Sequence, residues 1–258
     1  MPELPEVERA RALIAERGLH RRIVAVDDSD TYVCRPHAPG EIADALVGRK
    51  LVSAERRGKS MWCETSDDGP ALGLHLGMTG RIVIDEDEAG DPAPAVEPRR
   101  ADRFTIRFAD GGALVLRDRR RLGRARLEPV IDRLGPDAAD VARAEFRYRV
   151  GRGRVAVKSR IMDQAVIAGV GNLLADEALW KAGIDPRRPA GELTVEELDR
   201  LRNAIRAATR SALRKGGVHT GALIPHRRRE GVCPRCGTPL SRATIGGRTT
   251  WWCGAEQR

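Results

Sequence analysis

The chain has 258 residues, enough to bury a substantial core in one large domain or two smaller ones. Its 46 lysines and arginines exceed its 37 aspartates and glutamates, and the formal net charge of +9 points to nucleic acid or an anionic surface as partner. Aromatic residues make up only 3%, which argues against a single-strand binder built on rows of stacking rings. No apolar run approaches the roughly 18 residues needed to span a membrane, and no signal peptide is apparent, so we expect a cytoplasmic protein without a membrane partner.

The first residues, Met1-Pro2-Glu3-Leu4-Pro5-Glu6, would place a secondary amine at the start of the chain once Met1 is removed. An α-amine has a pKa of roughly 7.7–8.0, so part of it is unprotonated near neutral pH and can attack a sugar carbon to form a Schiff base. The same residues also suit a helix start, because proline favours the first turn and glutamate the positive end of the helix dipole. On these residues alone, the helix start is the simpler interpretation.

A helix is predicted after Pro5, because apolar residues from Val7 to Ile14 recur at helical spacing, and Gly18 is its expected stop. Short extended segments follow, and Asp110-Gly111-Gly112 is a hairpin signal between the last two. Many short strands separated by turns favour an antiparallel sandwich or barrel. We expect strands over residues 23–26, 51–56, 61–65, 72–76, 82–84, 104–108 and 114–117, and a solvated loop insertion over residues 85–98.

After about residue 130 the pattern becomes helical. Thr194-Val195-Glu196-Glu197 is a capping-box sequence, and an apolar stripe from Leu198 to Ala208 leads to a stop at Gly216-Gly217. Before a second expected helix over residues 173–182, Gly169-Val170-Gly171-Asn172 offers an N-cap at Asn172 and free N–H groups that suit a phosphate. An ordinary packing corner between helices is the alternative for this motif.

Three of the five cysteines lie near the C-terminus, which favours a metal site over a disulfide framework. Cys233-Pro234-Arg235-Cys236 and Cys253 match the spacing of a zinc ribbon, but Glu256 stands where its last cysteine would be. Glu256 or His226 could supply the fourth ligand, or the site could be weakened or empty. Cys34 and Cys63 stand alone and are expected to be buried and unreactive.

Basic residues gather at three turns. Arg56-Arg57-Gly58-Lys59-Ser60 lies between two expected strands, and Asp118-Arg119-Arg120-Arg121-Leu122-Gly123 follows another. Arg248 stands after Gly246-Gly247 inside the cysteine-bearing tail, where a guanidinium can bind a phosphate with two hydrogen bonds. Each cluster could equally be a solvated face, although a chain of this charge could use them to clamp a nucleic-acid backbone.

Taken together, these segments resemble the formamidopyrimidine-DNA glycosylase/endonuclease VIII family of base-excision repair enzymes, and the resemblance covers nearly the whole chain. It is carried by the stretch from Met1 to Glu8, by Arg57-Gly58-Lys59, by Leu74-His75-Leu76-Gly77-Met78-Thr79-Gly80, by Gly169-Val170-Gly171-Asn172, and by Arg248 with the cysteines.

The resemblance implies an α+β fold of two domains with DNA held in the cleft between them. Residues 1–130 would form a catalytic β-sandwich domain with an N-terminal helix, and residues 131–222 a helical helix–two-turn–helix domain that binds DNA. Residues 223–258 would form a β-hairpin zinc finger. The protein would be a monomer acting on damaged DNA, in duplex form, at the nucleoid.

The family's residue roles carry over to matching positions. Pro2 would attack C1′ of the damaged nucleotide, Glu3 would protonate the deoxyribose ring oxygen, and Glu6 would support both. Lys59 and Arg248 would act at the catalytic centre and, with His75 and Asn172, would grip the phosphates around the flipped nucleotide. Met78, Arg120 and Leu122 would fill the void left by the flipped base, with Arg121 and Lys158 as further DNA contacts. Zinc would be structural, held by Cys233, Cys236, Cys253 and Glu256.

This sequence departs from the family at three places. Leu122 stands where an aromatic residue is usual, Glu256 replaces a cysteine, and residues 217–229 are too short for the loop that caps 8-oxoguanine. Oxidised pyrimidines or another lesion therefore compete with 8-oxoguanine and ring-opened purines as substrates. We expect a bifunctional glycosylase and abasic-site lyase that acts by β,δ-elimination. The alternatives are a catalytically silent damage-binding protein and a basic zinc-ribbon protein that binds nucleic acid.

Overall fold

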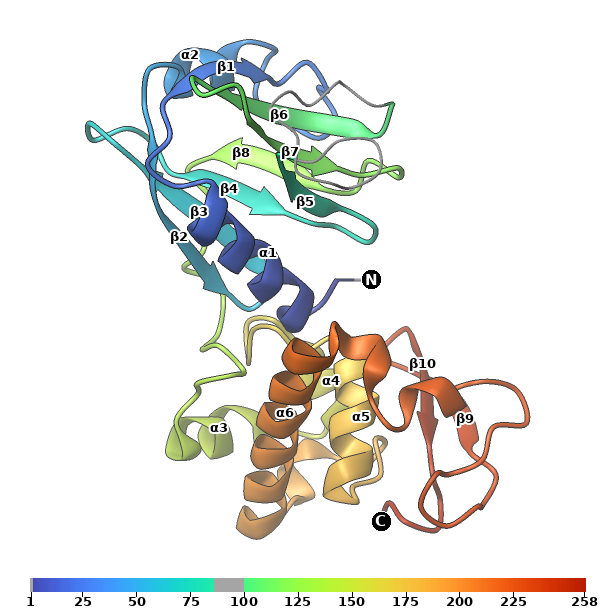
Figure 1. Cartoon of the computed structure of the whole chain (residues 1–258). Helices are drawn as coiled ribbons and strands as arrows, with labels where there is room; N and C mark the ends of the chain where they lie inside the picture. The colour runs from blue at the N-terminus through green and yellow to red at the C-terminus, as the bar shows by residue number, and fades with distance from the viewer. Residues whose placement is uncertain (1, 86–99) are drawn as a thin grey trace. The chain divides into compact units, whose positions relative to one another are not determined.

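A computed structural model describes residues 2–85 and 100–258 of the chain (Figure 1). The chain divides into two compact units, of which the first holds Pro2 and residues 7–131 and the second residues 3–6 and 132–258. Met1 lies outside the described residues, as does the expected loop insertion apart from Asp85. The predicted α+β class is confirmed, with sheets in the first unit and helices with a small hairpin in the second.

The first unit is a sandwich of two antiparallel sheets, ordered β1-β6-β7-β5 and β2-β3-β4-β8 (Figure 1). Inward-facing apolar side chains of both sheets form one core, which also receives the apolar face of helix α1. The elements are α1 (Leu4–Arg17), β1 (Ile23–Asp27), α2 (Glu41–Leu46), β2 (Leu51–Arg57), β3 (Ser60–Thr65), β4 (Leu72–His75), β5 (Arg81–Ile84), β6 (Asp102–Phe108), β7 (Ala113–Arg117) and β8 (Arg124–Leu127).

All seven strands expected in this unit and its first helix are present within two residues of their predicted bounds. Two elements were not predicted. Helix α2 has only six residues, too few for a helical period to show in the sequence. Strand β8 reads Arg-Ala-Arg-Leu, and its arginines looked like a continuation of the basic run before it.

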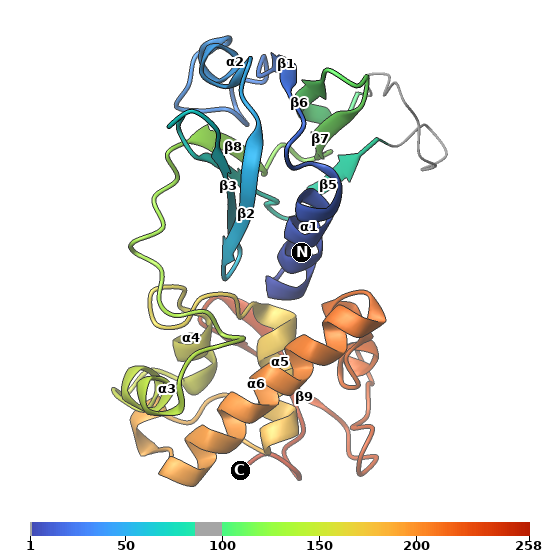
Figure 2. The same cartoon turned by 60° about the vertical axis from the view of Figure 1, so that its left-hand side comes forward.

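The second unit packs four α-helices around one apolar core (Figure 2). The capping box at Thr194 and the end of the helix at Gly216, in the left-handed region, are confirmed. The predicted apolar stripe of this helix is buried in the core. The elements are α3 (Arg143–Val150), α4 (Val157–Met162), α5 (Asn172–Ala182), α6 (Val195–Lys215), three short 3-10 helices at Ala190–Glu192 (η1), Val218–Thr220 (η2) and Ile224–His226 (η3), and the hairpin β9 (Ser241–Ile245) with β10 (Arg248–Trp252).

Within the two described stretches, none of the helices is both long enough and apolar enough to cross a membrane.

Candidate active site and nucleic-acid interface

The Glu3 carboxylate occupies the start of helix α5. Its Oε1 accepts a hydrogen bond from the backbone N–H of Leu173 at 2.8 Å, and its Oε2 accepts those of Gly171 and Leu174 at 3.0 Å each. The side chain is fully buried, at 0% exposure. Free N–H groups and the positive end of the helix dipole favour an anion here, and the chain supplies its own. The residue after Pro2 is therefore held in one position.

The predicted N-cap at Asn172 is wrong. Asn172 is the first residue of α5. Its N-cap is Gly171, which has no side chain that could bond the helix. The Glu3 carboxylate satisfies the N–H groups that an asparagine cap would have bonded. Gly171 permits this approach, because a Cβ at that position would lie 2.3 Å from Cδ of Glu3. The Asn172 side chain instead donates from Nδ2 to the backbone oxygen of Thr249 at 3.1 Å.

Glu6 fixes the backbone of the same segment. Its Oε2 accepts the N–H of Glu3 at 2.9 Å, and its Oε1 accepts the N–H of Val218, in η2, at 2.7 Å. The first turn of the chain is thus tied to the segment that follows α6. This geometry suits the supporting role expected for Glu6.

Lys59 lies in the tight turn between β2 and β3, after Gly58 with φ of 61°. Arg56 holds this turn, since it donates from Nη1 to the Gly58 oxygen at 3.0 Å and from Nε to Glu8 at 2.8 Å. Desolvation opposes ionisation of Glu8, but hydrogen bonds from Arg11 and Arg56 outweigh it and lower the pKa of this carboxyl. The hairpin that carries Lys59 is therefore anchored to helix α1 by ionic hydrogen bonds.

Met78 lies in one loop of the first unit, and Arg120 and Leu122 lie in another. Asp118 links the two loops by hydrogen bonds. Its Oδ1 accepts the Thr79 hydroxyl at 2.5 Å, and its Oδ2 accepts the N–H groups of Leu122 at 2.7 Å and Gly123 at 2.8 Å. Asp118 is buried, whereas Met78 and Arg120 are exposed and Leu122 is partly exposed. Sequence reasoning grouped Asp118 with the basic run but did not identify its organising role.

Gly77 brings the same two loops into close contact. It has φ of 62°, and a Cβ there would lie 2.4 Å from the backbone of Leu122. Its N–H donates to Nδ1 of His75 at 2.9 Å, so a neutral His75 carries its proton on Nε2. Desolvation and the nearby charges of Lys59 and Arg126 lower the pKa of His75. The ring is thus a neutral hydrogen-bond donor near pH 7.

Beside these loops, the first unit has a cavity of about 980 Å³ lined by six arginines with Thr79 and Ala101. Part of this charge is balanced, because Arg117 donates from Nε to Asp102 at 2.6 Å. Arg121 pairs with Asp30 at 2.8 Å and remains exposed. An arginine-rich surface of this kind suits the phosphates of a nucleic acid. The lining arginines are Arg81, Arg100, Arg103, Arg117, Arg119 and Arg120.

Arg248 begins strand β10 directly after the hairpin turn of Gly246 and Gly247. Both glycines have positive φ, 56° and 72°, as a two-residue turn matched to the twist of a hairpin requires. The Arg248 side chain is exposed. Asn172 bonds the backbone of the next residue, Thr249, so the structure brings the starts of α5 and β10 together.

Lys158, expected to contact DNA, is instead buried at 0% exposure. Its Nζ lies 2.7 Å from Oδ1 of Asp176 and donates to the Thr250 hydroxyl at 2.7 Å. Asp176 also pairs with Arg227 at 2.8 Å and accepts the N–H of Trp251 at 3.1 Å. Lys158 therefore ties α4 and α5 to strand β10, and its ammonium is not presented to a ligand in solution.

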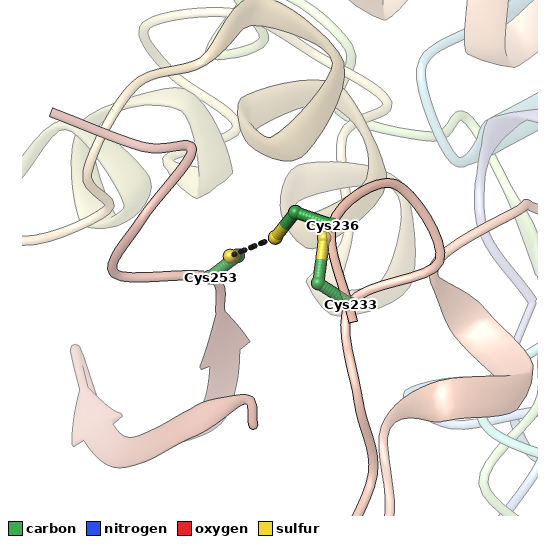
Figure 3. Close-up of side chains that lie close together, drawn as sticks. All are labelled: Cys233, Cys236 and Cys253. Atoms are coloured by element: carbon green, nitrogen blue, oxygen red, sulfur yellow. Dashed lines mark hydrogen bonds between the residues drawn. The ribbon is translucent and has the colours of Figure 1, made fainter. Parts of the chain in front are cut away.

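The sulfur atoms of Cys233, Cys236 and Cys253 lie within 4.8 Å of one another (Figure 3). Desolvation of the Cys233 thiol is outweighed by hydrogen bonds from the Trp180 indole and the backbone, which lower its pKa to about 7. Among the residues that the structure describes, neither Glu256 nor His226 joins this group. The carboxylate of Glu256 lies 3.6 Å from Nη1 of Arg235 instead.

The two isolated cysteines are buried, as predicted. Desolvation, with smaller contributions from nearby acidic residues, raises the pKa of Cys34 and of Cys63 to about 12. Both therefore stay as thiols at neutral pH and are unreactive.

Residues 1–125 match the formamidopyrimidine-DNA glycosylase N-terminal domain, and residues 134–222 match the H2TH domain of the same family. The formamidopyrimidine-DNA glycosylases of Alkalilimnicola ehrlichii and of a Roseiflexus species are each 36% identical, over 100% of both chains. Lactococcus lactis Fpg bound to DNA with an abasic site is similar in structure, with a TM-score of 0.85, 25% identity and 100% of both chains covered. Its complex with DNA containing an oxidised pyrimidine has the same TM-score at 26% identity, with 100% of both chains covered.

Proposed function

The chain belongs to the formamidopyrimidine-DNA glycosylase family, and on this basis we propose that it excises an oxidised or ring-opened base from DNA and then cleaves the abasic site. The observation that carries the proposal is the buried carboxylate of Glu3, the residue directly after Pro2. Three backbone N–H groups hold this carboxylate in place. The carboxylate also satisfies the start of α5, but only a catalyst gains from having it directly after an N-terminal amine. We place the activity of this chain in the cytoplasm, at the nucleoid.

The chemistry begins at the Pro2 nitrogen, which becomes a free secondary amine when Met1 is removed. The amine attacks C1′ of a nucleotide flipped out of the stack, and the base leaves with the bonding electron pair. The amine gives up a proton, which Glu3 passes to the ring oxygen O4′ as the C1′–O4′ bond opens. A positively charged Schiff base between Pro2 and C1′ remains. It acidifies the C2′ proton, whose loss expels the 3′ phosphate, and elimination of the 5′ phosphate follows.

We assign phosphate binding to three side-chain donors that the fold holds in place, of which Lys59 is partly exposed and His75 and Arg248 are exposed. His75 offers Nε2–H, Lys59 an ammonium on an anchored hairpin, and Arg248 a guanidinium at a rigid turn. Met78, Arg120 and Leu122 enter the duplex where the base has left, and Asp118 keeps their loops together. Leucine at position 122 would fill the space in the duplex without stacking on a base.

We also propose that the cysteine cluster holds a structural zinc ion. The sulfurs of Cys236 and Cys253 lie 3.5 Å apart, close to the separation of about 3.8 Å that a tetrahedral ion with zinc–sulfur bonds of about 2.3 Å requires. The Trp180 indole N–H, 3.4 Å from the Cys233 sulfur, is a second-layer donor of the kind that orients metal ligands. When bound, zinc would stabilise the fold of the tail that carries Arg248.

Borohydride trapping on duplex DNA with an abasic site tests the catalytic proposal. We expect a covalent adduct that mass spectrometry locates at residue 2, because only an unprotonated amine at C1′ forms a reducible Schiff base. Pro2→Gly should keep its affinity for DNA and lose much of its strand scission. Lys59→Met serves as the control, since its adduct should stay on residue 2. Tight binding without any adduct would instead indicate a silent damage-binding protein.

A further inference from the structure

We propose that the metal site of the tail is a three-cysteine site whose fourth coordination position is open to a small ligand from solution, such as a thiol. This inference rests on the proposed metal binding and goes beyond it, because it assigns a ligand-exchange position to Cys233, Cys236 and Cys253. The sequence pattern favours Glu256 as the fourth ligand, whereas the contacts around the cluster indicate that neither Glu256 nor His226 occupies this position.

Glu256 is turned toward a cation. Its Oε2 lies 3.6 Å from Nη1 of Arg235, and the carboxylate is 32% exposed. Arg235 cannot easily move away, because its guanidinium stacks on Trp180 at 4.0 Å and donates to the Trp180 oxygen at 3.1 Å. A carboxylate paired with a fixed guanidinium loses that pair if it rotates to a metal.

The turn that carries Glu256 is also fixed from its other side. Gln257 is buried, accepts the N–H of Cys253 at 2.9 Å and donates to the Ile184 oxygen at 2.9 Å. The N–H of Gln257 in turn bonds the Cys253 oxygen at 3.0 Å. These bonds hold the residues around position 256 in a turn that suits a side chain of cysteine length better than one two atoms longer.

His226 does not replace Glu256. It ends the 3-10 helix η3, and its backbone oxygen accepts the N–H of Arg228 at 2.8 Å. Gly231 packs so closely on it that a Cβ there would lie 1.9 Å from the same oxygen. Neither ring nitrogen of His226 belongs to the ligand group found in the described part of the chain.

The cluster opens to solvent at one cysteine. Cys233 and Cys253 are buried against Trp180 and Leu223, whereas Cys236 is exposed. Figure 3 shows the three side chains converging on one point from two segments of the tail. Because zinc prefers four ligands in a tetrahedron, an ion held by these three sulfurs would have one position left for another ligand.

Cobalt(II) binding to the full chain tests this proposal, because thiolate-to-cobalt charge-transfer absorption grows with the number of bound sulfurs. We expect 2-mercaptoethanol to raise this absorption of the cobalt-loaded wild-type protein by about one third, as three thiolates become four. Glu256→Gln and His226→Gln should give the wild-type spectrum and the same response to thiol. Glu256→Cys should show the larger absorption from the start and should not respond.

The opposite pattern would overturn the inference. A wild-type spectrum that does not respond to thiol would show that no open position exists, and a spectrum altered by Glu256→Gln would in addition make Glu256 a ligand. A cluster that binds no cobalt at all would remove the metal site and this inference with it. Neither result touches the catalytic proposal, which the adduct at Pro2 decides by itself.

Discussion

Three backbone N–H groups at the start of α5 hold the side chain of Glu3, a residue that stands 168 positions before the nearest of them. A residue pattern cannot reveal this contact, because it depends on the fold returning Gly171 to the start of the chain. Gly169 and Gly171 before Asn172 indicate only that some group can approach the backbone closely here, and they do not say which group. At this scale, the Pro2-Glu3 pair was predicted from the family resemblance, whereas the way Glu3 is held was not.

His75 gives a prediction on pH. Desolvation, followed by the charges of Lys59 and Arg126, lowers its pKa, so the folded state favours the neutral ring. The neutral ring therefore contributes to the free energy of unfolding at pH values above the usual histidine pKa of about 6.5. This contribution is lost as the pH falls through the lowered pKa of the folded protein. NMR titration of the ring protons should give a midpoint below 6.5 with the proton on Nε2 at neutral pH.

Lys59→Met is the matched variant for this titration. Removal of the Lys59 charge should move the His75 midpoint upward, though not fully, because desolvation is the larger cause. A midpoint at or above 6.5 in the wild-type protein would contradict the environment described for this ring.

At the scale of elements, most strands and the helices α1, α5 and α6 followed from spacing and turn residues, whereas helices α2, α3 and α4 and the contacts between elements did not. Asp118 shows the difference. Its place after a strand and before three arginines was visible in the sequence, but its bonds to Thr79, Leu122 and Gly123 depend on two loops meeting. The same limit explains Lys158, whose charge looked available for DNA until the packing of α4, α5 and β10 was known.

Lys158→Met should destabilise the protein without changing how DNA binding depends on salt. It leaves the buried Asp176 with one cationic partner fewer, and removing one member of a buried ion pair typically costs about 3–5 kcal/mol. Lys181→Met, which removes a partly exposed partner of Glu177, should cost less than about 1 kcal/mol. Urea unfolding measures the free energy of unfolding of both variants. If Lys158→Met left this free energy unchanged and made DNA binding depend less on salt, Lys158 would be a DNA contact.

At the scale of the whole molecule, net charge and family resemblance predicted the partner, and the lesion remained open. The chain carries +9, and its basic side chains gather at turns that the fold presents, such as the Lys59 hairpin and the arginine-lined cavity. Composition alone could not separate exposed cations, such as Arg120 and Arg248, from those held in internal ion pairs. Arg227 with Asp176 is such a pair, and so is Arg117 with Asp102, although Arg117 also lines the cavity. The binding of DNA is therefore a property of a subset of the basic residues.

Salt dependence measures the size of that subset. Each lysine or arginine that contacts a phosphate releases counterions, so the slope of log K against log salt reports the number of contacts. Arg248→Ala should weaken binding to any sequence and reduce the slope by about one unit, because its exposed side chain stands at a rigid turn. Arg242→Ala, in the same hairpin but beside Trp251 at the far end from the turn, should leave the slope unchanged. Equal effects from both variants would mean that the hairpin contributes only general charge and that Arg248 makes no defined phosphate contact.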